Sequence, residues 1–412
     1  MNRRQLLKVS LAAVSLGSVP ARAAEPRRPR VLLRNGWQSI NIGDVAHYVG
    51  MMELFRKYGI EADVRLWTSN MENGADELFR KYFPEVPFFT GGSSVATAFE
   101  ECDFLLHGSG SGFVAQGDVK KWADQTGKPF GVMGISLPGA SSSTYDLLKK
   151  ADFAYFRDGV SAATATENGC PAMGWGPDTA FGVVKTRDDA AATAFLHAHH
   201  LEAGKFLCCI PRYRWTPHWL VKKGREFDAK KDARSQAMKE HDHAPYREAI
   251  TQVTRQTEMK VLITCEDKTQ IALGKEVLYD PLPDDVKQKV VFRDRFWPLD
   301  EAVGVFVQSA GLFGNEMHSP IMCIANGIPA TVGRWDEQTK KGFMWRDIGL
   351  EDWLFTMDDE TQVAKIPATI LALAKNPAAA KAKAEAARKI VVHKQDEQFA
   401  HLKKSLTKVV AG

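Results

Sequence analysis

Short apolar segments alternate with helical segments through most of this 412-residue chain, and this alternation limits its fold more than any other feature. The strands expected in the first half occupy residues 30–34, 60–66, 102–106, 129–135 and 153–156. Helical segments separate them, so neighbouring strands need crossover connections and should run parallel. We therefore expect an α/β fold with a mostly parallel sheet that helices cover on both faces.

The same pattern restarts after a Gly/Pro-rich stretch at residues 174–181, with an apolar segment at residues 205–210. A chain of this length exceeds the usual size of one hydrophobic core. We predict a first α/β domain at residues 30–185, a second at 203–356 and a C-terminal helical tail at 357–412. The charged stretch at residues 216–245 interrupts the alternation, and is expected to be either a pair of solvated helices or an excursion over the cleft.

The N-terminus resembles a twin-arginine export signal. Arg3 and Arg4 precede a weakly apolar stretch that ends in small residues, and we predict cleavage after Ala23. Residues 1–23 hold Arg3, Arg4, Lys8 and Arg22 and no acidic residue, so their removal takes the formal charge from +4 to 0. A near-neutral mature protein does not favour a nucleic-acid partner. The expected localisation is periplasmic or secreted, the export machinery is an expected partner, and no membrane span is expected in the mature protein.

Six cysteines stand mostly in apolar, strand-like contexts, at positions 102, 170, 208, 209, 265 and 323. Their spacing matches neither a metal-binding motif nor a dense disulfide framework. Buried free thiols are therefore expected.

Polar residues gather at the expected strand ends, although the common phosphate-loop, zinc-protease and serine-hydrolase motifs are absent from the sequence. In parallel α/β sheets, ligands bind at the carboxyl ends of the strands. Two such sheets facing each other would define one cleft between the domains. The strand-end residues are Asn41, Asp44, Ser109, Gly110, Arg157, Asp158, Arg212, Arg214, Glu266, Asp267, Glu316 and His318.

Five short motifs follow one another along the chain, at residues 41–44 (Asn-Ile-Gly-Asp), 102–110, 156–161, 176–181 (Gly-Pro-Asp-Thr-Ala-Phe) and 317–329. In this order and spacing, over roughly residues 30–355, the chain resembles the polysaccharide pyruvyl transferase family. The resemblance implies two Rossmann-like domains facing a cleft, as in GT-B glycosyltransferases. It also implies transfer of pyruvate from phosphoenolpyruvate, as co-substrate, onto two hydroxyls of a polysaccharide or oligosaccharide acceptor as a ketal. No other cofactor and no metal ion are expected.

The resemblance also implies roles for individual residues. His318 matches the histidine of the family's Arg-Leu-His motif and would be the acid–base residue. Arg212 or Arg214 would hold the anionic donor with its guanidinium group. Ser109 and Gly110 belong to a glycine-rich strand end that would let the donor anion approach backbone N–H groups.

Asn41 and Asp44 would bind substrate at the mouth of the first domain. For Asp44, capping of the following helix is an equally good interpretation. Arg157 and Asp158 are expected to form a structural turn pair.

Glu316 stands where the family motif has arginine. We predict that this carboxylate pairs with Arg212, Arg214 or Arg334, or accepts hydrogen bonds from sugar hydroxyls as a substrate-binding residue. Two alternatives to pyruvyl transfer stay open. One is glycosyl transfer from a nucleotide sugar in the same fold, and the other is a non-catalytic carbohydrate-binding or assembly protein.

Overall fold

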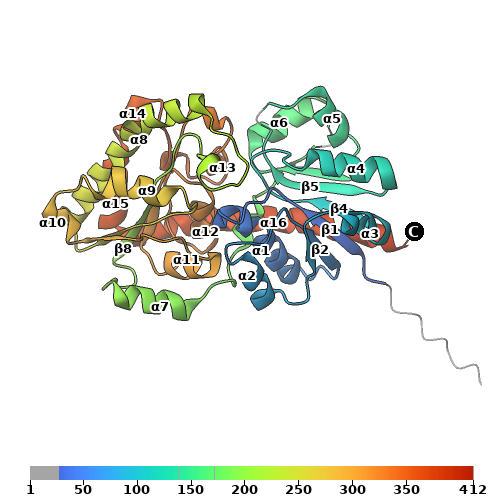
Figure 1. The fold of residues 1–412 in the computed structure, drawn as a ribbon, viewed down its shortest axis with the longest axis horizontal. Helices are drawn as coiled ribbons and strands as arrows, with labels where there is room; N and C mark the ends of the chain where they lie inside the picture. Colours follow the sequence, from blue (N-terminus) through green and yellow to red (C-terminus); the bar gives the residue numbers. More distant parts are fainter. Residues whose placement is uncertain (1–26, 138, 171, 412) are drawn as a thin grey trace, which may run out of the picture.

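The computed structural model describes residues 27–411 except 138 and 171. The predicted signal peptide, residues 1–23, therefore lies outside the described residues. Figure 1 shows two α/β halves, one holding β1, β2, β4 and β5 and the other holding β8 with α7 to α11. Among the described residues, no helix combines the length and apolarity needed to cross a membrane.

The first half contains a seven-stranded sheet in the order β3-β2-β1-β4-β5-β6-β7, in which every pairing is parallel. The sequence pattern does not indicate β3 or β7, which are the short strands at the two edges. The expectation of a parallel sheet is confirmed. The strands are β1 (Arg30–Arg34), β2 (Asp63–Trp67), β3 (Phe88–Phe89), β4 (Phe104–His107), β5 (Phe130–Ile135), β6 (Phe153–Phe156) and β7 (Ala172–Trp175).

Helices cover both faces of this sheet, and consecutive strand residues point to opposite faces. Val31 and Leu33 belong to one buried cluster, whereas Leu32 belongs to the other. The central strands are therefore apolar throughout, as expected for strands buried on both sides. The helices are α1 (Ile42–Lys57), α2 (Ala75–Tyr82), α3 (Ser93–Glu101), α4 (Gln116–Thr126), α5 (Ser142–Leu148), α6 (Gly159–Glu167) and the 3-10 turn η1 (Thr179–Gly182).

The second half contains a four-stranded parallel sheet in the order β10-β9-β8-β11. A parallel bridge from Leu312 to Ala330 leads on to the two-stranded parallel pair β12 and β13. These strands are β8 (Phe206–Ile210), β9 (Lys260–Ile263), β10 (Val290–Phe292), β11 (Gly311–Gly314), β12 (Val332–Arg334) and β13 (Leu354–Thr356).

One long helix, α8 (Ala229–Gln256), replaces the helix pair that the charged stretch suggested. It continues through Pro245, which is buried. The alternation of lysine and acidic residues along residues 229–244 marks the solvated side of this helix rather than a break. The other helices are α7 (Asp189–Ala198), α9 (Gln270–Gly274), α10 (Asp284–Lys287), α11 (Leu299–Phe306), α12 (His318–Ala325), α13 (Met344–Asp347), α14 (Glu360–Val363) and α15 (Ile366–Lys375), with short turns η2 (His218–Leu220), η3 (Lys275–Tyr279), η4 (Asp336–Gln338) and η5 (Glu351–Trp353).

The final helix, α16 (Pro377–Ala411), leaves the second half and runs back across the first (Figure 1). Phe399 on this helix is fully buried and stacks on Tyr58 at a centroid distance of 4.9 Å. Lys57 donates a hydrogen bond to Gln395 at 3.2 Å. Lys383 near the start of α16 pairs with Asp352 of the second half, so the helical tail packs on both halves. All six cysteines are buried and free, which confirms that expectation.

Candidate functional site

The two halves meet where α1 begins. Asn41 caps this helix, because its side-chain oxygen accepts hydrogen bonds from the N–H groups of Gly43 and Asp44 at 2.7 and 3.3 Å. Asn41 also forms an antiparallel bridge with Asp267, and the N–H of Ile42 donates to the carbonyl of Glu266 at 3.0 Å. The first motif of the first half therefore docks on the carboxyl end of β9.

Helix α12 begins at the same place, with His318 as its first residue. The Nδ1 atom of His318 lies 3.0 Å from the Glu266 carboxylate. The other oxygen of Glu266 accepts hydrogen bonds from the N–H and the hydroxyl of Ser319, at 2.7 and 2.8 Å. These contacts require Nδ1–H to be the donor, so Glu266 fixes the orientation of the imidazole.

Burial and, to a smaller extent, nearby His47 together lower the pKa of His318 to about 3. The imidazole is therefore neutral at pH 7. Its Nε2 atom is buried and has no hydrogen-bond partner among the residues that the structure describes.

His47 on α1 faces His318 from the first half, with its ring edge-on at a centroid distance of 4.8 Å. Its Nε2 atom lies 3.4 Å from the carboxylate of Asp178, which in turn accepts a hydrogen bond from Arg157 at 2.9 Å. Burial opposes ionisation of Asp178, but His47 and Arg157 outweigh it and lower the pKa of this carboxyl. We call these four residues, His47, Arg157, Asp178 and His318, the histidine cluster. All four are buried, and His318 is the most exposed of them at 9%.

Glu316 lies beside this cluster and holds two cations. Arg212 donates a hydrogen bond to it at 2.9 Å, which confirms one of the pairings predicted for Glu316, and the Lys341 ammonium lies 3.5 Å away. Gln270 donates to its second oxygen at 2.6 Å. Burial lowers the pKa of Lys341 to about 8, Arg212 lowers it too, and Glu316 opposes the shift.

Arg214 does not offer its guanidinium to the cleft. Its side chain is fully buried, and it donates to both oxygens of Asp242 at 2.8 and 2.9 Å. It also donates to Glu337 and Asp358. The expected donor-binding role for Arg214 is therefore corrected: three carboxylates already use its N–H groups.

Ser109 and Gly110 are likewise part of the sheet framework. The Ser109 hydroxyl accepts a hydrogen bond from the N–H of Thr179 at 2.8 Å. The N–H of Gly110 donates to the carbonyl of Gly134 at 3.3 Å, in register with a bridge to Ile135. Neither group is free to bind an anion, so the anion site expected at this strand end is corrected as well.

Asp44 lies half-buried in the first turn of α1, and the capping role belongs to Asn41. Burial lowers the pKa values of His318 and Lys222, and the negative charge of Asp44 partly opposes both shifts, so Asp44 lies near the cluster. Asp158 caps α6 by accepting a hydrogen bond from the N–H of Ser161, as a structural residue would. Arg157 instead supports the cluster through Asp178.

Three residues of the site, His47, Asp178 and Lys341, are not among those predicted from the sequence. Asp178 stands inside the motif at residues 176–181, which marks it. His47 lies six residues after Asn41, in the second turn of α1, and carries no sequence signal of its own. Lys341 lies between two short helical elements and carries no sequence signal.

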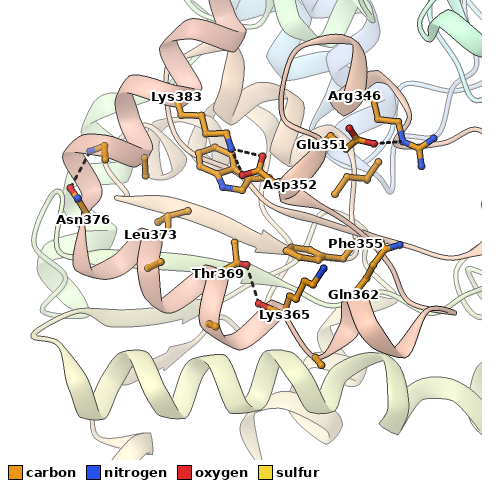
Figure 2. A pocket seen from close by; sticks show the side chains of 17 residues that line it. Arg346, Glu351, Asp352, Phe355, Gln362, Lys365, Thr369, Leu373, Asn376 and Lys383 are labelled. Carbon is orange, nitrogen blue, oxygen red and sulfur yellow. Dashed lines mark hydrogen bonds and ion pairs between the residues drawn. The ribbon is translucent and has the colours of Figure 1, made fainter.

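A large cavity, about 980 Å³, lies elsewhere, between α15, α16 and the segment around Trp353. Figure 2 shows Lys383 of α16 pointing to Asp352 across this hollow. None of its lining residues belongs to the histidine cluster. Size alone therefore does not identify the functional site of this protein.

Solved structures with the same architecture include a putative UDP-N-acetylglucosamine 2-epimerase from Listeria monocytogenes, with 10% identity and a TM-score of 0.55 over 87% of this chain and 91% of that one. Another is UGT2 from Phytolacca americana, solved with UDP-2-fluoro-glucose and pterostilbene, with 10% identity and a TM-score of 0.55 over 92% and 100%. Such low identities establish the fold alone. The fold is that of the GT-B class, with two Rossmann-like domains facing each other.

The sequence profile of the polysaccharide pyruvyl transferases matches residues 41–336, which is most of the chain. The protein therefore belongs to the polysaccharide pyruvyl transferase family, a family of transferases. No curated protein sequence matches it significantly.

Proposed function

We propose that this protein transfers pyruvate from phosphoenolpyruvate to two hydroxyls of a polysaccharide, forming a ketal. The family membership supports this reaction, and so does the group of residues at the domain interface. The observation that carries the proposal is the pair of cations, Arg212 and Lys341, which both face Glu316, two residues before His318.

The chemistry requires three things of the site. The methylene carbon of the donor must gain a proton, the attacking hydroxyl must lose one, and the donor's carboxylate and phosphate need positive partners. Arg212 and Lys341 supply positive charge. Neutral His318, oriented by Glu266, supplies a ring nitrogen that can exchange protons.

Glycosyl transfer from a nucleotide sugar is the second candidate. Glu316 favours it, because this carboxylate occupies Arg212 and places a negative charge where an anionic donor would bind. A carboxylate there could accept hydrogen bonds from ribose or sugar hydroxyls. Loss of the donor site altogether, leaving a carbohydrate-binding or assembly protein, is the third.

Export belongs to the proposal too, with cleavage after Ala23 and a periplasmic or secreted mature protein. The sequence of residues 1–23 supports it. Replacing both Arg3 and Arg4 with lysine should retain the protein in the cytoplasm, because twin-arginine signals depend on that pair. N-terminal sequencing of the exported protein should begin at Ala24, and export of the lysine variant would contradict this route.

Thermal unfolding of the mature protein with different ligands separates the three candidates. Because a ligand that binds the folded state raises its stability, phosphoenolpyruvate should raise the melting temperature. A rise with nucleotides but not with phosphoenolpyruvate would favour the glycosyltransferase. A rise with oligosaccharides alone would favour the binding protein and contradict pyruvyl transfer.

A further inference from the structure

We infer that His47, Asp178 and His318 form a three-ligand site for a divalent transition-metal ion such as zinc. The inference goes beyond the proposed reaction and differs from the sequence expectation, which includes no metal. It rests on the positions of these side chains and does not depend on the identity of the donor.

The distances between the potential ligand atoms suit a metal ion. One ligand atom from each of His47, Asp178 and His318 lies within 4.8 Å of the others. The His47 Nε2 atom and the Asp178 carboxylate oxygen are 3.4 Å apart, yet Nε2 has no hydrogen bond with acceptable geometry. Two ligands bound tetrahedrally at zinc distances stand roughly 3.3 Å apart, so both atoms can point at one ion between them.

Unpartnered ring nitrogens are the second observation. Both ring nitrogens of His47 and Nε2 of His318 are buried without a hydrogen-bond partner among the described residues. Leaving a buried polar atom unpaired costs free energy, on the order of 1–3 kcal/mol. A metal ion bound to one nitrogen from each ring would remove two of these three unpaired atoms.

The surrounding contacts are those that orient metal ligands. Metal-bound histidines usually donate their other ring N–H to a carboxylate. His318 has this arrangement with Glu266, which leaves Nε2 as the ring nitrogen that can bind an ion. Asp178 is fixed by Arg157 and by the N–H of Ala180, at 2.9 Å each.

The charged groups around the cluster are compatible with a bound cation. Arg157 pairs with Asp178, and both Arg212 and Lys341 face Glu316. Glu266 contacts only the neutral His318 among these groups, and the carboxylate of Asp44 also acts on His318. Three protein ligands also leave a coordination position open for a donor oxygen or water.

Metal binding would also change the roles proposed for His318 and Lys341. A bound ion uses the Nε2 lone pair of His318, so this histidine cannot exchange protons while the ion is present. Lys341, whose pKa burial lowers to about 8, is then the group beside Glu316 that can exchange protons near neutral pH.

The test measures metal binding directly, without donor or acceptor. Mature protein is treated with a chelator, desalted, given increasing zinc and analysed for bound metal. His47→Gln and His318→Gln remove one proposed ligand each. His107→Gln is the matched control, because His107 is also a fully buried histidine with an unpartnered ring nitrogen but lies outside the cluster.

Wild type and the His107→Gln variant should bind about one zinc per chain, and the two cluster variants should bind at least about 100-fold more weakly. Circular dichroism confirms that each variant is folded. X-ray absorption of the loaded wild type should show nitrogen and oxygen ligands with imidazole scattering. No tight binding by wild type, or equal binding by folded cluster variants, would overturn the inference. Since no donor is used, failure of pyruvyl transfer would leave this result unaffected.

Discussion

Glu316 is the residue at which this chain departs from its family, and the structure shows how that carboxylate is accommodated. Arg212, Lys341 and Gln270 come from three different segments and all face it. Glu316 is 2% exposed, so an unpaired charge there would be costly. The fold therefore accommodates glutamate at position 316. What the glutamate changes is the positive charge that remains available to bind an anionic donor.

Replacing Glu316 with glutamine should strengthen phosphoenolpyruvate binding. The substitution keeps the shape and removes a negative charge beside Arg212, and we expect the dissociation constant to fall about tenfold, equivalent to about 1.4 kcal/mol. Isothermal titration measures the effect. Glu337→Gln is the control, because Glu337 pairs with Arg214 away from the cluster. Weaker donor binding by Glu316→Gln would show that the carboxylate itself holds the ligand.

Donor binding should weaken as the pH rises through about 8, because Lys341 loses its charge there. Burial, Arg212 and Arg157 lower the pKa of Lys341, whereas Glu316 and Glu266 oppose the shift. Below pH 8 the buried ammonium is present and binds the anion. The same shift makes folding less favourable at low pH, since the unfolded chain binds this proton more tightly, and stability should recover as the pH rises above 8.

Titrating phosphoenolpyruvate affinity from pH 6.5 to pH 9.5 checks this. Lys341→Met should bind weakly at every pH, and Lys341→Arg should keep its affinity above pH 8, because arginine stays charged. An unchanged pH profile in Lys341→Met would exclude Lys341 as the titrating group.

At the scale of elements, the site depends on the contact between the first turns of α1 and α12. Gly43 makes this contact possible, because a Cβ atom at position 43 would lie 2.3 Å from Nδ1 of His318. Asn41 caps α1 and bridges to Asp267, so capping and domain docking use the same residue. The motif at residues 41–44 thus supplies part of the contact between the two halves.

Gly43→Ala should therefore push α1 away from α12 and break the His318–Glu266 contact. We expect a loss of about 1–3 kcal/mol in the free energy of unfolding, with a large loss of ligand binding. Urea unfolding measures the first quantity. Gly117→Ala is the matched control, because Gly117 lies in α4 with open space around its Cβ position, and alanine there should be neutral or stabilising. Equal effects of the two substitutions would contradict the proposed role of Gly43.

Much of this arrangement could be predicted from the sequence, but not all of it. Apolar segments located five strands of the first sheet, and the parallel topology placed His318 and Glu266 at strand ends on one side. The edge strands β3 and β7 were missed, since a two- to four-residue strand carries little pattern. His47 and Lys341 were missed because their meeting with His318 depends on how two domains dock, which local patterns do not encode.

At the scale of the whole molecule, α16 ties the halves together. It begins beside the second sheet, where Lys383 pairs with Asp352, and ends on the first half, where Phe399 stacks on Tyr58. Gln398 on the same helix lies against Gly176. Because α16 contacts both halves, it holds their interface closed around the histidine cluster.

Phe399→Ala should destabilise the protein by about 3–5 kcal/mol, because it empties a fully buried ring site. Ile390→Ala on the same helix is the control: Ile390 is 40% exposed, and its loss should cost much less. Differential scanning calorimetry measures both. Similar effects of the two variants would mean that the C-terminal half of α16 does not stabilise the first half.

Analysis of the ketal and phosphate products tests whether this site transfers pyruvate. The mature protein is incubated in D₂O with phosphoenolpyruvate and surface polysaccharide from the source organism, and the products are followed by NMR. We predict a new ketal methyl signal carrying one deuteron, one phosphate released per ketal, and neither product with His318→Ala. Consumption of a nucleotide sugar without any ketal signal, or full pyruvylation by His318→Ala, would contradict the account.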